Sequence, residues 1–520
     1  MGKQAKKKEY TSTMPNRITG CTRVRRNKRG CVKMHSLFYL SGMHYITGNS
    51  RHQIEIYNTL ELAISEQSYV RLIDLLCEQF VMEDLDVFEQ KGRQNKGRKA
   101  YSPQTLLKIY VYGYLNSIAS SRRLEQECKR NIEMMWLCHK LIPDHKTISD
   151  FRRLNGEAIK QLVSSFTTML QQSGFIKGET ISIDGTKLNA NAAQLIGSQE
   201  LEERLKEIKL KIDQYLEKVE SKDIADDDLD ETRRSKEELE QQVQQLQGQL
   251  QKLHTAKKEM EEYGLKKVSL TDPQSRNMRF KDQGIDLGYN LQAATDAAHG
   301  FIITTVVTNA QNDIRQLAPM IEEVASQLQS YPKEAIADSG YYLQDDIEKL
   351  ETLKQVECFV AIAENERSKT DKVNGNSFIY NAQKDEIICS EGKRLLPIGK
   401  PHKVREGHTA QRYMGESCPT CNKRPLCTTA KRGRRSVYRF DNQLWKEGYQ
   451  QKMQTPEAKQ KLKQRKTLAE APFGIMKMWM GHIPILLRGI NKVQTEINLY
   501  TLAYNFKRWF KLMNHQPAFA

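Results

Sequence analysis

The sequence predicts an α/β protein in which a mixed sheet follows a helical N-terminal domain and is interrupted by two insertions. Three observations lead to this prediction. Helical periodicity dominates the segment from residue 43 to residue 174. Short runs rich in β-branched residues then alternate with helical stretches between residues 179 and 362. A long heptad segment and a cysteine-rich segment break this alternation.

Length and composition agree with a protein of several domains. The 520 residues leave room for about three domains, each able to bury a core. No run of eighteen apolar residues is present, so we expect no membrane partner. The basic start MGKQAKKK continues into polar residues, unlike a signal peptide. We therefore expect a cytoplasmic protein.

The net charge of +17 points to a polyanionic partner, but much of it lies at one end. Residues 1–42 hold eleven Lys or Arg and one Glu, which gives +10. Such a segment can bind nucleic acid through counterion release, or it can be a disordered extension. We expect residues 1–42 to be a disordered extension.

Residues 43–174 are predicted to form the helical domain. Ser102 is a plausible helix cap and Pro103 suits a first turn. The periodic stretches are 60–80, 102–128 and 143–170. Several arginines are candidates for phosphate contacts or for ordinary solvated faces, and the sequence leaves both open. They are Arg122, Arg123, Arg152 and Arg153.

The predicted core occupies residues 175–197 and 266–365. Its elements follow the order strand, strand, strand, helix, strand, helix, strand. The expected bounds are 179–184, 288–296, 300–308, 312–328, 334–338, 343–353 and 355–362. The insertion at 198–265 has apolar residues at heptad spacing on both sides of an acidic break, which predicts a coiled-coil-like antiparallel hairpin or a dimer contact. The heptad positions are Leu201, Leu205, Ile208, Ile212, Tyr215 and Val219, then Leu239, Val243, Leu246, Leu250, Leu253 and Met260.

Three carboxylates suggest a catalytic site. Asp184 ends the first predicted strand and Asp338 the fourth, and we expect these two strands to be neighbours. Glu470 lies in the terminal helix, with Lys477 two turns later on the same face. Such a set can bind two Mg²⁺ or Mn²⁺ ions for phosphoryl transfer. Taken singly, each acid is equally explained as a turn residue or as an acid near a helix N-terminus.

Four cysteines in the second insertion, residues 366–460, form another constellation. Cys418 and Cys421 have the Cys-x₂-Cys spacing of a metal site, and Cys389 with Cys427 completes a tetrahedral set. We expect one structural Zn²⁺ here. Free thiols and a redox pair are the alternatives.

Several motifs together resemble the DDE transposases of bacterial insertion sequences. The motifs are IDGTKLNANA (183–192), TDPQSRNM (271–278), GYNLQAATD (288–296), ADSGYY (337–342), RKTLAEAPFGIMK (465–477) and LLRGINKVQTEINLYTLAYNFKRW (486–509). The resemblance implies a ribonuclease-H-like core completed by residues 461–520. It places Asp184, Asp338 and Glu470 on the acidic triad, and Arg465 and Lys477 on the flanking basic positions that would contact DNA. The tyrosine that the wider family often has just before this arginine is absent, and Leu462 stands there.

The resemblance also implies a function. Such an enzyme would cleave the ends of an insertion sequence and join the 3′-hydroxyls to target DNA. Its partners would be double-stranded DNA, namely the terminal inverted repeats and the target, and a second copy of the chain assembled on that DNA. It would act at the nucleoid. Residues 43–174 would contribute DNA binding. The alternatives are a metal-dependent nuclease and a non-catalytic DNA-binding regulator or decayed transposase.

Overall fold

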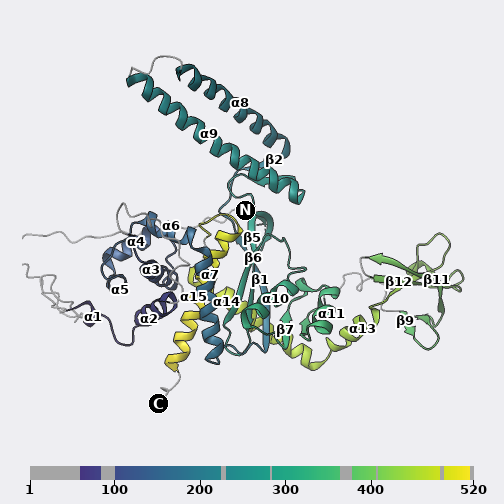
Figure 1. Cartoon of the computed structure of the whole chain (residues 1–520). Helices are drawn as coiled ribbons and strands as arrows, with labels where there is room; N and C mark the ends of the chain where they lie inside the picture. Colours follow the sequence, from purple (N-terminus) through teal and green to yellow (C-terminus); the bar gives the residue numbers. More distant parts are fainter. Residues whose placement is uncertain are drawn as a thin grey trace, which may run out of the picture. The chain divides into compact units, whose positions relative to one another are not determined.

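The computed structural model is summarised in Figure 1. The predicted extension at 1–42 lies outside the residues that it describes. The described residues are 59–82, 100–223, 230–281, 284–362, 378–405, 408–480 and 485–515. Across these ranges, no helix combines the length and apolarity needed to cross a bilayer.

The N-terminal region is helical. The side-chain oxygen of Ser102 accepts a hydrogen bond from the backbone N–H of Thr105, and Pro103 opens the helix, as predicted. The predicted stretch 102–128 is two helices, because Ser117 takes a left-handed conformation (φ 62°) between them. The helices are α1 Leu60–Ala63, α2 Tyr69–Met82, α3 Pro103–Leu115, α4 Ser121–Arg130, α5 Ile132–Leu137, α6 His145–Leu154 and α7 Gly156–Gln172.

The core is a mixed six-stranded sheet. The strand order is β4-β5-β1-β7-β8, and β6 also pairs with β5. Strand β1 runs antiparallel to β5 and parallel to β7, and β7 runs parallel to β8. The first and fourth predicted strands are thus neighbours. The elements are β1 Thr180–Asn189, β4 Arg276–Phe280, β5 Gly284–Asp296, β6 Ile302–Thr308, α10 Leu317–Leu328, β7 Glu334–Ala337, α11 Gln344–Leu353 and β8 Glu357–Val360.

Three predicted boundaries in the core are wrong, and one strand was not predicted. Strand β5 begins at Gly284 and not at residue 288, and the unpredicted strand β4 pairs with this earlier part of β5. Strand β1 does not end at Asp184 but continues to Asn189, because its residues up to Asn189 pair with the long strand β5, the last pair being Asn189 with Gly288. Helix α10 begins at Leu317 and not at residue 312. Residues 312–316 therefore form a loop before the helix, and this loop carries Asp313.

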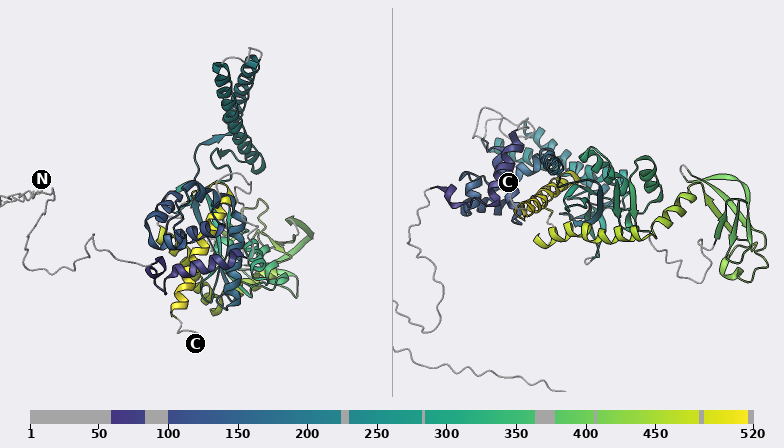
Figure 2. Two further views of the ribbon diagram at one scale, coloured as in Figure 1. Left: turned by 60° about the vertical axis from the view of Figure 1, so that its left-hand side comes forward. Right: turned by 90° about the horizontal axis from the view of Figure 1, so that it is seen from below.

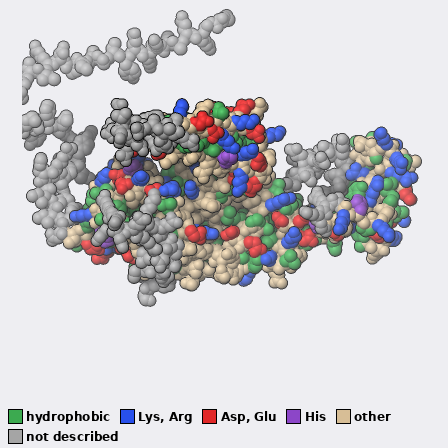
Figure 3. Space-filling view, turned by 45° about the horizontal axis from the view of Figure 1, so that its top comes forward, with side chains coloured by type: hydrophobic (Ala, Val, Ile, Leu, Met, Phe, Trp, Pro, Cys, Tyr) green, Lys and Arg blue, Asp and Glu red, His purple; other side chains and the backbone are tan. Residues whose placement is uncertain are grey.

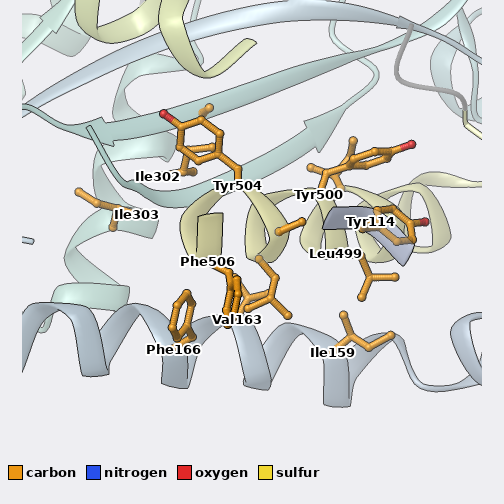
Figure 4. Packing of buried hydrophobic residues seen from close by; sticks show 14 of the residues in the cluster. Tyr114, Ile159, Val163, Phe166, Ile302, Ile303, Leu499, Tyr500, Tyr504 and Phe506 are labelled. Carbon is orange, nitrogen blue, oxygen red and sulfur yellow. The ribbon is translucent and has the colours of Figure 1, made fainter. Parts of the chain in front are cut away.

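The C-terminal helix α15 Ile490–His515 packs against both the N-terminal helices and the sheet. Figure 4 shows its apolar side chains between α7 and β6. Its amide side chains also bond the open edge of β6. The Asn505 side chain accepts a hydrogen bond from the N–H of Ile302 and donates one to its carbonyl, and Gln494 bonds Thr305 and Val307 in the same way. These backbone N–H and C=O groups of the edge strand β6 thus have hydrogen-bond partners although no further strand pairs with them.

The first insertion is a helical hairpin, visible in Figure 2. Helices α8 Ser198–Asp223 and α9 Asp230–Tyr263 lie side by side above the short strands β2 Leu195–Gly197 and β3 Lys267–Ser269. Residues at the start of α8 share one apolar cluster with residues at the end of α9, so the helices are antiparallel. The cluster includes Leu201, Leu205, Leu253, Ala256 and Met260.

The second insertion contains a five-stranded antiparallel sheet that the sequence reading did not anticipate. Its strands are β9 Phe378–Asn381, β10 Glu386–Cys389, β11 Arg394–Arg405, β12 His408–Gly415 and β13 Ser436–Phe440, with the short helix α12 Arg424–Cys427. Helix α13 Gln443–Lys452 leads back to the core, followed by α14 Pro456–Met480. In α13 the Tyr449 hydroxyl donates to the carbonyl of Val360 at the end of β8.

Candidate active site

Asp184 lies in the middle of β1, opposite Ala293 of β5. Its Oδ1 accepts a hydrogen bond from the N–H of Gly185 at 3.0 Å, and its side chain is only 17% exposed. The pKa of Asp184 is raised to about 6, mainly by burial and to a smaller extent by the carboxylates of Asp338 and Asp313, while the Gly185 N–H and Arg465 oppose the rise. A buried carboxylate of this kind gains from a nearby cation.

Asp338 follows β7 directly. Its Oδ1 accepts a hydrogen bond at 2.8 Å from the N–H of Gly340, so it caps the 3₁₀ turn Ser339–Tyr341. The register explains why it lies close to Asp184. Ser182 pairs with Ile336 across the parallel strands β1 and β7, two residues before each aspartate. The two acids therefore reach the same level of the sheet.

Helix α14 crosses this part of the sheet and brings Arg465 to Asp184. Arg465 Nη1 lies 3.7 Å from Asp184 Oδ1. One turn earlier, Lys461 bonds Glu334 of β7, and Leu462 packs against Ile336. Leu462, which stands where the wider family often has tyrosine, thus belongs to a small apolar cluster.

Glu470 and Lys477 lie in the same helix, α14. Glu470 follows Arg465 by five residues, about 7.5 Å along the helix axis at 1.5 Å per residue. The side chains of both residues lie outside what the structure describes. Their predicted roles remain predictions.

A third aspartate that the sequence reading missed lies beside the first two. Asp313 comes from the loop before α10, and its Oδ1 accepts hydrogen bonds from Asn290 Nδ2 (2.7 Å) and Gln292 Nε2 (2.8 Å) on β5. Lys187 Nζ of β1 lies 3.6 Å from the same oxygen. The dipeptide Asn-Asp at 312–313 is a turn signal that argued against a helix here.

The glycines that follow the aspartates fit closely into this arrangement. A Cβ on Gly185 would lie 2.6 Å from Gln292 Nε2 and 2.9 Å from Asp313 Oδ1. The buried Tyr341 hydroxyl, which donates to Gln292 Oε1, would lie 3.0 Å from the same Cβ. Any side chain at residue 185 would displace the amide and carboxylate beside Asp184, so the glycine is required for close approach.

The donor set around Asp184 suits a hard divalent cation. Its atoms are the carboxylate oxygens of Asp184, Asp338 and Asp313. Beside Asp313, the fully buried Asn290 has an amide oxygen with no hydrogen-bond partner among the described residues. Oxygen ligands of this kind are those that Mg²⁺ and Mn²⁺ prefer. In the described ranges, however, no three acidic, His or Cys side chains are placed to hold one ion between them.

The four predicted cysteine ligands surround one small cavity of about 30 Å³ in the second insertion. Cys389 comes from β10, Cys418 and Cys421 from the loop after β12, and Cys427 from the end of α12. Burial, together with the other three thiols, raises the pKa of Cys427. The four thiols are therefore gathered, although their geometry is not that of a formed metal site.

Comparisons with known proteins point to one family. Residues 58–154 match the model "Transposase domain (DUF772)", and residues 388–510 match the model "Transposase DDE domain". No curated protein matches the chain. Among solved structures, a piggyBac transposase synaptic complex with hairpin DNA aligns over 84% of this chain and 75% of that one. Its sequence identity is 9% and its TM-score 0.33, too low to establish a common fold. On the two family matches, the chain resembles the DDE transposases of insertion sequences.

Proposed function

We propose that the chain is a DNA transposase that cleaves the ends of its insertion sequence and joins the 3′-hydroxyls to target DNA. The observation that carries the proposal is the register of β1 and β7, which brings Asp184 and Asp338 to one level of the sheet beneath the helix that holds Arg465. An order of three antiparallel strands followed by parallel ones supports a ribonuclease-H-like core. We assign residues 175–197, 266–365 and 461–520 to it.

The chemistry follows from the residues at this site. Asp184, Asp338 and Glu470 would hold two Mg²⁺ or Mn²⁺ ions, which when bound supply activation of the attacking oxygen and stabilisation of the leaving oxygen. The Arg465 guanidinium, now beside Asp184, would bind a phosphate oxygen of the DNA. Lys477 would bind an adjacent phosphate as a point charge.

The charge distribution supports DNA as the partner. Residues 378–440 contain fourteen Lys or Arg and five Asp or Glu, a net charge of +9. Figure 3 shows Lys and Arg spread over the surface of this insertion, at the right of the view. We propose that this surface and the helices of residues 43–174 bind DNA backbone, and that two copies assemble on the paired ends at the nucleoid. The hairpin α8–α9 is our candidate dimer contact.

We propose in addition that Cys389, Cys418, Cys421 and Cys427 bind one structural Zn²⁺. Their common cavity supports this, as does the closed tetrahedral set that four thiolates provide. Small rotamer changes would bring the thiolates to the metal, since ligands become ordered when the ion binds. The ion would fix the loop after β12 to β10.

The test is cleavage of a DNA duplex that carries the element's own ends, with Mg²⁺, by the wild-type chain and by Asp184→Asn. We expect cleavage and strand joining by the wild type, and end binding without cleavage by the variant. The matched control is Asp286→Asn on β5, an exposed acid that should leave cleavage unchanged.

Three other results would contradict the proposal in different ways. Cleavage without joining would indicate a nuclease. End binding without cleavage by the wild type would indicate a regulator or decayed transposase. Full activity of Asp184→Asn would remove this aspartate from the site.

A further inference from the structure

The two oxygens of the Asp313 carboxylate lie in different surroundings. Oδ1 is fixed by the amides of Asn290 and Gln292. Oδ2 accepts no hydrogen bond from the residues that the structure describes. A Cβ placed on Gly340 would lie 3.7 Å from this oxygen and 3.0 Å from Asp338 Oδ1. The free oxygen of Asp313 and a carboxylate oxygen of Asp338 therefore face the same small space.

Among the described residues, two buried polar atoms next to Asp313 have no hydrogen-bond partner, although the second of them forms an ion pair with Asp313 at 3.6 Å. They are the Oδ1 of Asn290, on a fully buried side chain, and the Nζ of Lys187. Lys187 and Asn290 are opposite each other across β1 and β5, and both approach Asp313. A buried acceptor without a donor is uncommon and points to a ligand that brings one, such as metal-bound water.

We propose that Asp313 is a fourth carboxylate of the cation site, binding the divalent cation at Asp184 and Asp338 through the cation's water ligands. This inference rests on the proposed function. Contact through water is the mode we propose because Mg²⁺ keeps several of its waters in protein sites. Asn290 Oδ1 would accept from the same water shell.

The competing explanation is structural: Asp313 would only order the amides of β5. The substitution Asp313→Asn separates the two roles. Asparagine keeps an Oδ1 that accepts from Asn290 and Gln292. It removes the charge, and with it the ion pair with Lys187, and replaces the free oxygen by an NH₂ group. Asp313→Ser is the second variant, because its hydroxyl still accepts a hydrogen bond while both the charge and Oδ2 are lost.

The experiment measures Mn²⁺ binding to the full chain without DNA, by electron paramagnetic resonance of free Mn²⁺. We expect Asp313→Asn to bind Mn²⁺ about tenfold more weakly than wild type, the loss typical of residues that hold a metal's outer contacts. Asp184→Asn should lose binding at the site altogether. Glu323→Gln, an exposed acid on α10, should bind as wild type does.

The outcomes separate this inference from the proposed function. Wild-type affinity in a folded Asp313→Asn, with binding lost in Asp184→Asn, overturns this inference and leaves the proposed function standing. Absence of Mn²⁺ binding by the wild type overturns both. If thermal unfolding shows that Asp313→Asn does not fold, Asp313→Ser is measured in its place, and the same comparison applies.

Discussion

At the scale of single residues, Asp184 is a charge that destabilises the fold around it. Its pKa rises from the ordinary 3.8 to about 6, so the folded chain favours the protonated form. The raised pKa contributes to the free energy of unfolding. This contribution is fully present below pH 4 and is lost as the pH rises through 6. Above pH 6 the folded chain holds a buried carboxylate whose cost is about 2 to 3 kcal/mol.

We therefore predict that Asp184→Asn stabilises the cation-free chain at pH 8 by about 2 kcal/mol and has no effect near pH 4. The amide matches the protonated acid and can still accept from Gly185. Urea unfolding in EDTA across this pH range measures the difference. The exposed Asp286→Asn is the control. An equal effect at both pH values would show that the substitution acts through packing and not through charge.

At the scale of elements, α15 replaces a missing strand at the edge of β6. Because Asn505 is fully buried and bonds both backbone groups of Ile302, Asn505→Leu would leave a buried N–H and C=O without partners. We predict a loss of about 2 to 4 kcal/mol in unfolding free energy. Chemical denaturation measures it, with the exposed Lys511→Leu on the same helix as the control. A loss below 1 kcal/mol would mean that water can hydrogen-bond the N–H and C=O of Ile302 in the variant.

The cysteine cavity gives a second prediction for an element. Purified wild-type chain should contain about one Zn²⁺ per molecule, and Cys421→Ser should lose it together with the thermal stability of the second insertion. Elemental analysis and limited proteolysis measure these effects. The control is Ser390→Ala, which lines the same cavity but offers no strong ligand. Wild-type chain free of zinc would favour four unbound thiols.

At the scale of the whole molecule, local patterns predicted the order of the core elements except β4, but not which side chains distant segments bring to them. The β-branched runs at 300–308 and 334–338 are close to the observed β6 and β7, since buried strands carry a strong local signal. Asp313 was hidden inside an expected helix. It lies 129 residues from Asp184, and only the folded loop shows that they meet.

The second insertion shows a different limit. Strand β11 is basic and mostly exposed, and β12 is only partly buried. They therefore lack the clear alternation of apolar and polar residues that a half-buried strand gives.

The motif TDPQSRNM was one of the motifs that carry the family resemblance. Its Asp272 accepts hydrogen bonds from the N–H of Gly489 and from the Tyr289 hydroxyl, and these bonds fix the start of α15. A recognisable motif can therefore be structural.

The two segments that match transposase families are joined by a buried ion pair. Arg152 of α6 and Glu496 of α15 lie 3.1 Å apart, 3% and 0% exposed, and burial raises the pKa of Glu496 against the effect of the arginine. Glu496 also accepts from the N–H groups of Leu486 and Leu487. Because both partners are inaccessible to water, removing one leaves the other as an unpaired buried charge.

We predict that Glu496→Gln lowers the free energy of unfolding by about 3 to 5 kcal/mol. The helical region and the sheet should still unfold in one transition, since α15 packs against both. Circular dichroism and tryptophan fluorescence during urea unfolding test this. Arg153→Met changes the neighbouring, exposed arginine and should cost less than about 1 kcal/mol. Two separate transitions in the wild type would show that the helical region folds independently of the core, and the ion pair would then be a contact between two domains and not part of one cooperative unit.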